Sequence, residues 1–153
     1  MKKMLSVTEW HQMVMDGSAP PMRIVLNGWS MYPLIRIRRD YVTIVQPGIR
    51  PAIGDIVLFS DPNKEGRYVV HRVWKRNEKK GSVLTWGDNC QRPDEWIPLE
   101  CIWGKVILIE RNNRKIRPHP KTGIIWAWLW HQIMKAYRMR ERIRLLLGRK
   151  NKR

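Results

Sequence analysis

The pattern of hydrophobic positions near the N-terminus predicts a short helix. Three apolar residues recur at helical spacing after Ser6-x-x-Glu9, which has the form of a capping box. Gly17 suits the residue that follows a helix end. We therefore expect a helix over residues 7–16, whose apolar positions are Trp10, Met13 and Val14.

Between residues 22 and 110 the pattern changes to short apolar runs, several of them β-branched. Gly, Pro and Asp turn signals separate these runs. Short strands divided by turns are typical of a mostly β fold. The expected strands cover residues 22–26, 41–45, 56–59, 68–74, 81–86 and 102–109.

After Pro118-His119-Pro120 the chain has the pattern of one long helix over residues 122–147. Residues 123–134 are apolar on every side, and residues 135–144 are basic. The apolar part would be about 18 Å long as a helix, against about 30 Å of bilayer hydrocarbon. We expect a helix that lies in a membrane interface without crossing it. The alternative is a helix packed on the β region with its tryptophans in the core.

Charge divides the chain unevenly. Residues 1–110 carry 16 Lys and Arg against 12 Asp and Glu, whereas residues 111–153 carry 14 against one. Such a basic tail predicts an anionic partner, either an anionic membrane surface through residues 122–147 or nucleic acid. A tail that only improves solubility is the alternative. The organisation expected is a helix and linker over 1–21, a β domain over 22–117 and a basic helix and tail over 118–153.

The cysteines and the N-terminus argue against a zinc protein, a disulfide-bonded protein and a secreted protein. Cys90 and Cys101 lack the spacing of a zinc site, nothing supports a disulfide between them, and we expect reduced thiols and no metal or other cofactor. No apolar segment of a secretory signal peptide follows the basic N-terminus, and no run of 18 apolar residues occurs. We therefore expect a cytoplasmic protein or one peripheral to the inner membrane surface.

The hexapeptide GWSMYP places Ser30 in a bulky, rigid context. A serine is a poor nucleophile until a base takes its proton. His71 lies in VVHRV, a run that otherwise has the character of a buried strand, and a rigid strand can hold a base in place. A structural histidine is the alternative. Asp88 and Asp94, in a turn-rich loop, are candidates to orient the imidazole, or else are ordinary loop carboxylates.

The order of five motifs resembles the S24/S26 superfamily of serine peptidases, which includes signal peptidase I and the self-cleaving repressors. The motifs are GWSMYP, GDIVLF, VVHRV, WGDN with an Asp six residues after its own, and WGKV. VVHRV matches the branch of endoplasmic-reticulum, archaeal and sporulation-type signal peptidases, which has His where other members have Lys. The resemblance implies a signal-peptidase-like β fold and a serine endopeptidase that cleaves a leader or signal-like peptide.

The resemblance also implies a role for each site residue. Ser30 would attack the peptide carbonyl, and His71 would take its proton and pass it to the leaving amine. Asp94 would hold the imidazole, with Asp88 as nearby support, and the Ser30 N–H would help to stabilise the oxyanion. The substrate would lie extended as an added strand. The residues expected to bind it are Gly28, Met31 and Pro33.

The chain departs from the family pattern at several positions. Gly28 stands where many signal peptidases have Ser or Thr, Trp86 replaces the Lys of the TKGDN segment, and Arg39-Asp40 replaces Gly-Asp one residue late. We expect no N-terminal membrane anchor, and 21 residues before the first strand are too few for a helix-turn-helix, so nucleic acid is not the expected partner. The alternative function is a non-enzymatic β domain whose basic tail binds anionic membrane or nucleic acid.

Overall fold

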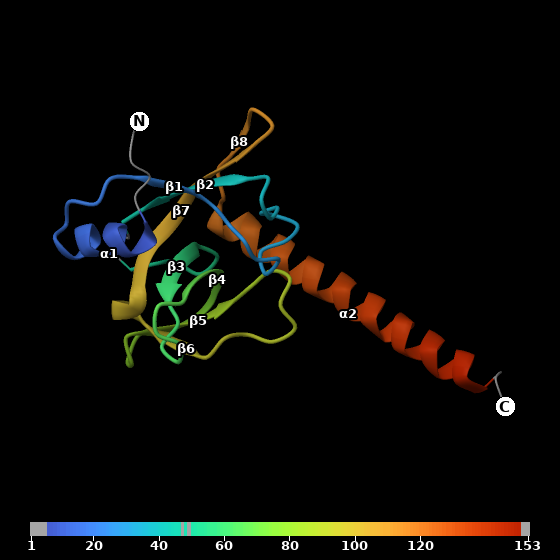
Figure 1. Ribbon diagram of the computed structural model, residues 1–153. Helices are drawn as coiled ribbons and strands as arrows, with labels where there is room; N and C mark the ends of the chain where they lie inside the picture. The colour runs from blue at the N-terminus through green and yellow to red at the C-terminus, as the bar shows by residue number, and fades with distance from the viewer. Residues whose placement is uncertain (1–5, 47, 49, 151–153) are drawn as a thin grey trace.

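The computed structural model describes residues 6–46, 48 and 50–150, with side chains to residue 146. It is mostly β: one antiparallel sheet of eight strands curls into a half-barrel, with a short helix near the N-terminus and a long helix near the C-terminus (Figure 1). The elements are α1 (Val7–Met15), β1 (Met22–Val25), β2 (Tyr41–Val45), β3 (Ile56–Ser60), β4 (Tyr68–Asn77), β5 (Ser82–Trp86), β6 (Trp96–Pro98), a 3-10 turn η1 (Leu99–Cys101), β7 (Ile102–Arg111), β8 (Arg114–Ile116) and α2 (Pro120–Lys150).

Helix α1 begins and ends where the sequence predicts. Ser6 Oγ accepts from the Glu9 N–H at 3.1 Å, and Glu9 Oε2 accepts from the Ser6 N–H at 2.9 Å, so both halves of the capping box are present. Gly17 follows the helix with φ 69°, a conformation that favours glycine. Trp10 is fully buried and lies against Gly104 of β7, where a Cβ would collide with it. The N-terminal helix therefore covers one face of the sheet.

The strands follow the order β1-β2-β7-β3-β4-β5-β6, with β8 paired to β7. Side chains alternate between the two faces of a strand. In β3 this places Leu58 in the cluster under α1, and Val57 and Phe59 in a second cluster on the other face. Strand β3 is buried along most of its length, and the neighbouring β4 is therefore held on a rigid support.

Two strands were not predicted, and both have only three residues. Strand β6 lies at one end of the sheet order, and β8 forms a hairpin with the end of β7. The turn of this hairpin is Asn112-Asn113, whose φ angles of 46° and 63° are both left-handed. Asn tolerates this conformation better than most residues, so the pair is a hairpin signal.

Helix α2 packs on the body through its first half and then extends away from it (Figure 1). The residues that face the body recur at helical spacing, and Ala127 among them is fully buried. Trp126 and Trp128 remain 44% and 52% exposed, so the helix packs on the β body without placing all its tryptophans in the core. In the described part of the chain, no helix combines the length and the hydropathy needed to cross a bilayer.

Candidate active site

His71 is held in the middle of the sheet by a carboxylate from the loop before β6. The residue is 6% exposed in β4, and its Nδ1 lies 2.6 Å from Oδ2 of Asp94. Thr85 of β5 donates its hydroxyl to the same oxygen at 2.7 Å, and the Asp94 N–H donates to the Thr85 carbonyl at 2.9 Å. Strand β5 therefore fixes the acid, and the acid fixes the imidazole through Nδ1, with Nε2 on the opposite side of the ring.

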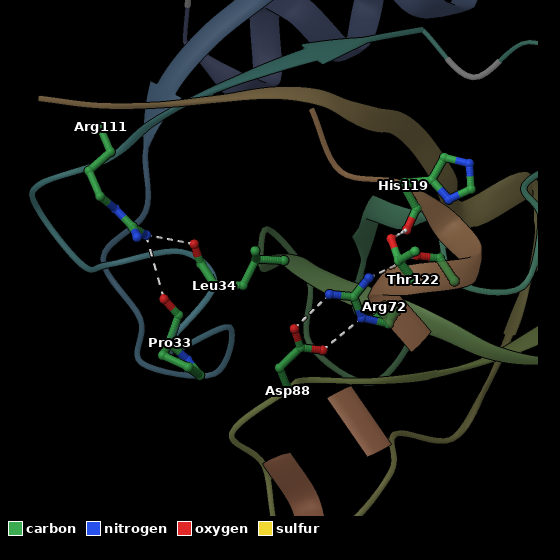
Figure 2. Close-up of polar contacts among 8 residues, drawn as sticks. Pro33, Leu34, Arg72, Asp88, Arg111, His119 and Thr122 are labelled. Carbon is green, nitrogen blue, oxygen red and sulfur yellow. Dashed lines mark hydrogen bonds and ion pairs between the residues drawn. The ribbon is translucent and has the colours of Figure 1, made fainter. Parts of the chain in front are cut away.

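Asp88 has a different partner. It accepts two hydrogen bonds from Arg72, from Nε at 2.8 Å and from Nη2 at 2.7 Å, and both side chains are at most 1% exposed (Figure 2). Successive residues of a strand point to opposite faces, so Arg72 turns away from the face that His71 occupies. Asp94, and not Asp88, contacts His71, in agreement with the motif spacing. Asp88 instead joins its loop to the buried guanidinium of β4.

Ser30 lies beside His71, across Gly87. The Ser30 carbonyl accepts from the Asn89 N–H at 2.7 Å. A Cβ added at Gly87 would lie 2.8 Å from this carbonyl oxygen and 2.9 Å from His71 Nε2, so the two groups are neighbours that only glycine allows. Among the described residues, none accepts the Ser30 N–H and none forms a hydrogen bond with its Oγ. The serine and the histidine are thus brought together but are not yet hydrogen-bonded.

The three residues predicted to bind substrate differ in position. Gly28 is exposed, and the nearest atom to a Cβ placed there is Ser30 Oγ at 4.0 Å. Met31 is 1% exposed and belongs to the core, which corrects the expectation that it lines the substrate groove, since its side chain supports the Ser30 turn from beneath. Pro33 is half-buried and follows a cis peptide bond.

Arg111, at the end of β7, holds the segment that follows Ser30. Its Nη2 donates to the Leu34 carbonyl at 2.8 Å and to the Pro33 carbonyl at 3.5 Å (Figure 2). The same guanidinium pairs with Asp40, which is fully buried. Burial raises the pKa of the Asp40 carboxyl, but hydrogen bonds from Arg111 and the Arg36 N–H outweigh it and hold this pKa below its usual value. The segment that follows Ser30 is therefore attached to the end of β7.

The electrostatic surroundings of His71 favour its protonated form. Burial lowers the pKa of the imidazole, but the hydrogen bond to Asp94, the contact with Cys90 and the charges of both raise it to about 9. Cys90 Sγ lies 4.0 Å from Nε2, at the outer limit of a hydrogen bond to sulfur. The imidazole is therefore a strong proton acceptor, and it acts as a base only in its neutral form.

A cavity of about 260 Å³ opens on the Asp94 side of the imidazole. Both His71 and Asp94 line it, and Phe59 of β3 packs its ring against His71 at a centroid distance of 6.1 Å. Charged side chains at the mouth have both signs, so the cavity suits a polar group of a peptide. Its remaining walls include Arg67, Glu95 and Ile97.

Several residues of the site were not identified from the sequence. Arg72 carries a signal that could have found it, because a charge inside an apolar strand needs a buried partner. Thr85, Gly87 and Cys90 reach the site through the path of the 86–94 loop, which no local pattern specifies. Arg111 and Asp40 are 71 residues apart in sequence. The pairing of β2 with β7 brings them together.

Neither comparison with known proteins adds to this picture: no model of a known protein family matches the chain, and no curated protein matches it.

Proposed function

We propose that the protein is a serine endopeptidase, similar to the His-containing branch of signal peptidase I, which cleaves a leader or signal-like peptide. The observation that carries this proposal is the 2.6 Å contact between His71 and Asp94, with Nε2 directed to the Ser30 segment across Gly87. A structural histidine could also be paired with a carboxylate, but the position of Nε2 beside the Ser30 segment favours a catalytic role. The arrangement has the order nucleophile, base and orienting acid that acyl transfer requires.

The chemistry follows from these three side chains. Ser30 Oγ attacks the peptide carbonyl while His71 Nε2 takes the hydroxyl proton, and Asp94 stabilises the imidazolium that forms. The Ser30 N–H, which no described residue accepts, is available to the developing oxyanion. The imidazolium then protonates the leaving amine, and water releases the acyl group by the same route. The Oγ–Nε2 hydrogen bond, absent from the free protein, is the contact that substrate binding has to add.

The position of β1 supports an extended substrate. In the described part of the chain this strand pairs with β2 alone and lies at one end of the sheet order, and the chain continues from it into the Ser30 turn. An edge strand has unpaired backbone groups on its outer side, and a peptide can add there as another strand. A peptide bound in this way would run toward the nucleophile.

Digestion of a diverse peptide pool that includes signal-like sequences tests the proposal. Mass spectrometry of new termini should find cleavage by the wild-type protein and a loss of at least about 100-fold in Ser30→Ala and His71→Ala. Ser18→Ala, at an exposed serine after α1, is the matched control and should cleave at the wild-type rate. Cleavage that persists in Ser30→Ala, or a wild-type protein that yields no new termini, would contradict the proposal.

We further propose that α2 binds the protein to an anionic membrane surface. Large apolar side chains are exposed along both halves of α2, as are most of the basic ones, and lipid acyl chains and acidic headgroups match this combination. Nucleic acid would satisfy the basic residues but would leave the aliphatic ones in water. The exposed apolar residues are Ile125, Trp126, Trp128, Leu129, Ile133, Tyr137, Met139, Ile143, Leu145 and Leu146.

A further inference from the structure

The loop after β5 holds one cysteine at the candidate active site. The Cys90 N–H donates to the Gly87 carbonyl at 2.9 Å, and the Cys90 carbonyl accepts from Trp86 Nε1 at 3.0 Å. The Asn89 N–H next to it is bonded to the Ser30 carbonyl at 2.7 Å. Three hydrogen bonds therefore fix the backbone around Cys90, and its side chain, which forms no disulfide, is only half-buried. The backbone thus positions the thiol, in a residue that is not fully buried.

The thiol meets the nitrogen that Ser30 requires. Cys90 Sγ lies 4.0 Å from His71 Nε2, and it is the one described side chain with a polar contact to this nitrogen. A Cβ added at Gly87 would lie 2.7 Å from Sγ, 2.9 Å from Nε2 and 2.8 Å from the Ser30 carbonyl oxygen. The thiol, the base and the serine segment therefore surround a single small space.

We propose that Cys90 is a reactive thiol that shares the base His71 with Ser30, and that covalent modification of Cys90 closes the site. The statement about closure rests on the proposed peptidase function. The statement about reactivity rests only on the Cys90–His71–Asp94 arrangement, because an adjacent base held by a carboxylate activates a thiol as it does a serine hydroxyl. The site would then respond to electrophiles and to disulfides of low molecular weight.

Two reactions could modify Cys90, alkylation and thiol–disulfide exchange. With iodoacetamide near pH 9, where part of the imidazole is neutral, His71 Nε2 takes the thiol proton, the Cys90 Sγ–carbon bond forms and the carbon–iodine bond breaks with loss of iodide. With a small disulfide, Sγ attacks one sulfur, a mixed disulfide forms and the second sulfur leaves as a thiolate. In both cases the group bound to Sγ lies where even a Cβ at Gly87 would collide, so it must push His71 Nε2 and the Ser30 segment apart. The serine proton then has no path to the base.

Alkylation kinetics test the reactivity without any substrate. Cys101 is the matched control, since it is the second free, half-buried cysteine, it packs beside the second core cluster, and in the described part of the chain it has no polar contact with His71. Iodoacetamide, followed by intact mass and peptide mapping, should modify Cys90 about tenfold faster than Cys101 or more. In His71→Ala the rate at Cys90 should fall about tenfold, while the rate at Cys101 stays unchanged. Equal rates at the two cysteines, or no effect of His71→Ala, would overturn the proposal.

Peptide cleavage by the modified protein tests the closure. Cys101→Ala, alkylated at Cys90, should lose at least about 90% of its cleavage rate, and Cys90→Ala should cleave at the same rate before and after treatment. With an aromatic disulfide in place of iodoacetamide, dithiothreitol should restore the activity. Full activity after complete alkylation of Cys90 would refute the closure. A wild-type protein without peptidase activity would refute the proposed function and leave the alkylation rates to decide the reactivity of Cys90.

Discussion

His71 and Arg72 are neighbours in β4, yet they serve opposite faces of the sheet. His71 is joined to Asp94 at the site, whereas Arg72 is joined to Asp88 and, through Nη1, to the Gly54 carbonyl at 2.9 Å. The alternation of a strand thus assigns one acid to each residue. The 86–94 loop is fixed at one point by the base and at another by a buried ion pair.

This division predicts different losses for the two acids. Asp94→Asn should reduce kcat by about 10²–10⁴, because the imidazole loses its orienting charge. It should also reduce the free energy of unfolding at neutral pH by about 1–3 kcal/mol, because Asp94 stabilises the protonated form of buried His71. Asp88→Asn should reduce the free energy of unfolding by about 3–5 kcal/mol, since Arg72 would be left as an uncompensated buried charge. Urea unfolding and peptide cleavage measured on both variants check this. If folded Asp88→Asn lost more kcat than folded Asp94→Asn, Asp88 and not Asp94 would be the acid that orients His71.

The raised pKa of His71 predicts an alkaline activity profile. With a pKa of about 9, the imidazole is protonated at neutral pH, so kcat/KM should rise about tenfold per pH unit until it levels near pH 9. Cys90 contributes to the rise in the pKa, so the rising limb should move to lower pH in Cys90→Ala. The profile of Cys101→Ala should match the wild type. Identical profiles for all three proteins would show that Cys90 does not influence the base.

The sequence predicted that Ser30, His71 and Asp94 lie together, because their motifs lie in short segments with a fixed order. The structure places Asp94 on His71 and the Ser30 carbonyl near Nε2, while the catalytic roles stay a prediction. The contact between Cys90 and His71 depends on how a loop of a few residues returns beside the strand, and hydrophobic pattern carries no information about that path. Met31 was misplaced for a related reason, since a motif residue can support a turn from the core as well as from the surface.

At the level of elements, the helices and strands that could be predicted are those with a capping motif or an apolar pattern within their own sequence. The capping box placed the start of α1, and alternating apolar runs placed six of the eight strands. Strands β6 and β8 have three residues each and are too short to show the alternation of apolar and polar residues. Pairing with β5 and β7, respectively, makes them strands. The start of α2 is Pro120, which suits the first helical position, and the helix therefore begins two residues earlier than the apolar pattern predicts.

The contact between Gly54 and the start of α2 predicts that Gly54→Ala destabilises the fold more than the same substitution at another glycine. A Cβ at Gly54 would lie 2.1 Å from the Pro120 carbonyl oxygen, and Gly54 also has φ 95°. Gly66 is the matched control, with φ 72° and no atom near its Cβ position. Gly66→Ala should cost about 1 kcal/mol of unfolding free energy from backbone strain, and Gly54→Ala at least about 3 kcal/mol, because the helix must also move. Equal losses in urea unfolding would show that this contact is not tight.

At the level of the whole molecule, charge and apolar exposure gather on α2. The part of the chain from residue 111 onward carries 14 of the 30 basic residues and a single acidic one. The side of α2 toward the body meets the sheet through Gly123 at Arg72 and His131 at Trp74 and Trp86. The outer side keeps its apolar residues in solvent. The sequence could not divide the helix in this way, because its first half is apolar all round.

Flotation with vesicles tests the membrane proposal on the full-length protein. It should float with phosphatidylcholine vesicles that contain phosphatidylglycerol and not with phosphatidylcholine alone. The double variant Trp126→Gln/Trp128→Gln should bind at least about tenfold more weakly, since two half-exposed indoles no longer enter the interface. Trp96→Gln is the matched control, because Trp96 of β6 is 45% exposed and far from α2 in sequence. Equal vesicle binding by the double tryptophan variant and Trp96→Gln would contradict the proposal. So would release of the protein from the vesicles by DNA, if the double tryptophan variant still bound the vesicles more weakly than the wild type.

For a peptidase bound to a membrane through α2, as proposed above, the packing of α2 on the sheet would set the height of the cleavage reaction above the membrane. With the outer side of α2 in the headgroups, one helix radius and one layer spacing separate the sheet from the surface, about 15 Å in all. A polypeptide leaving the bilayer covers that height with about four or five extended residues. The bond that is cut would then be selected by its distance along the chain from the membrane, so that substrates with unrelated sequences around the scissile bond could share one enzyme.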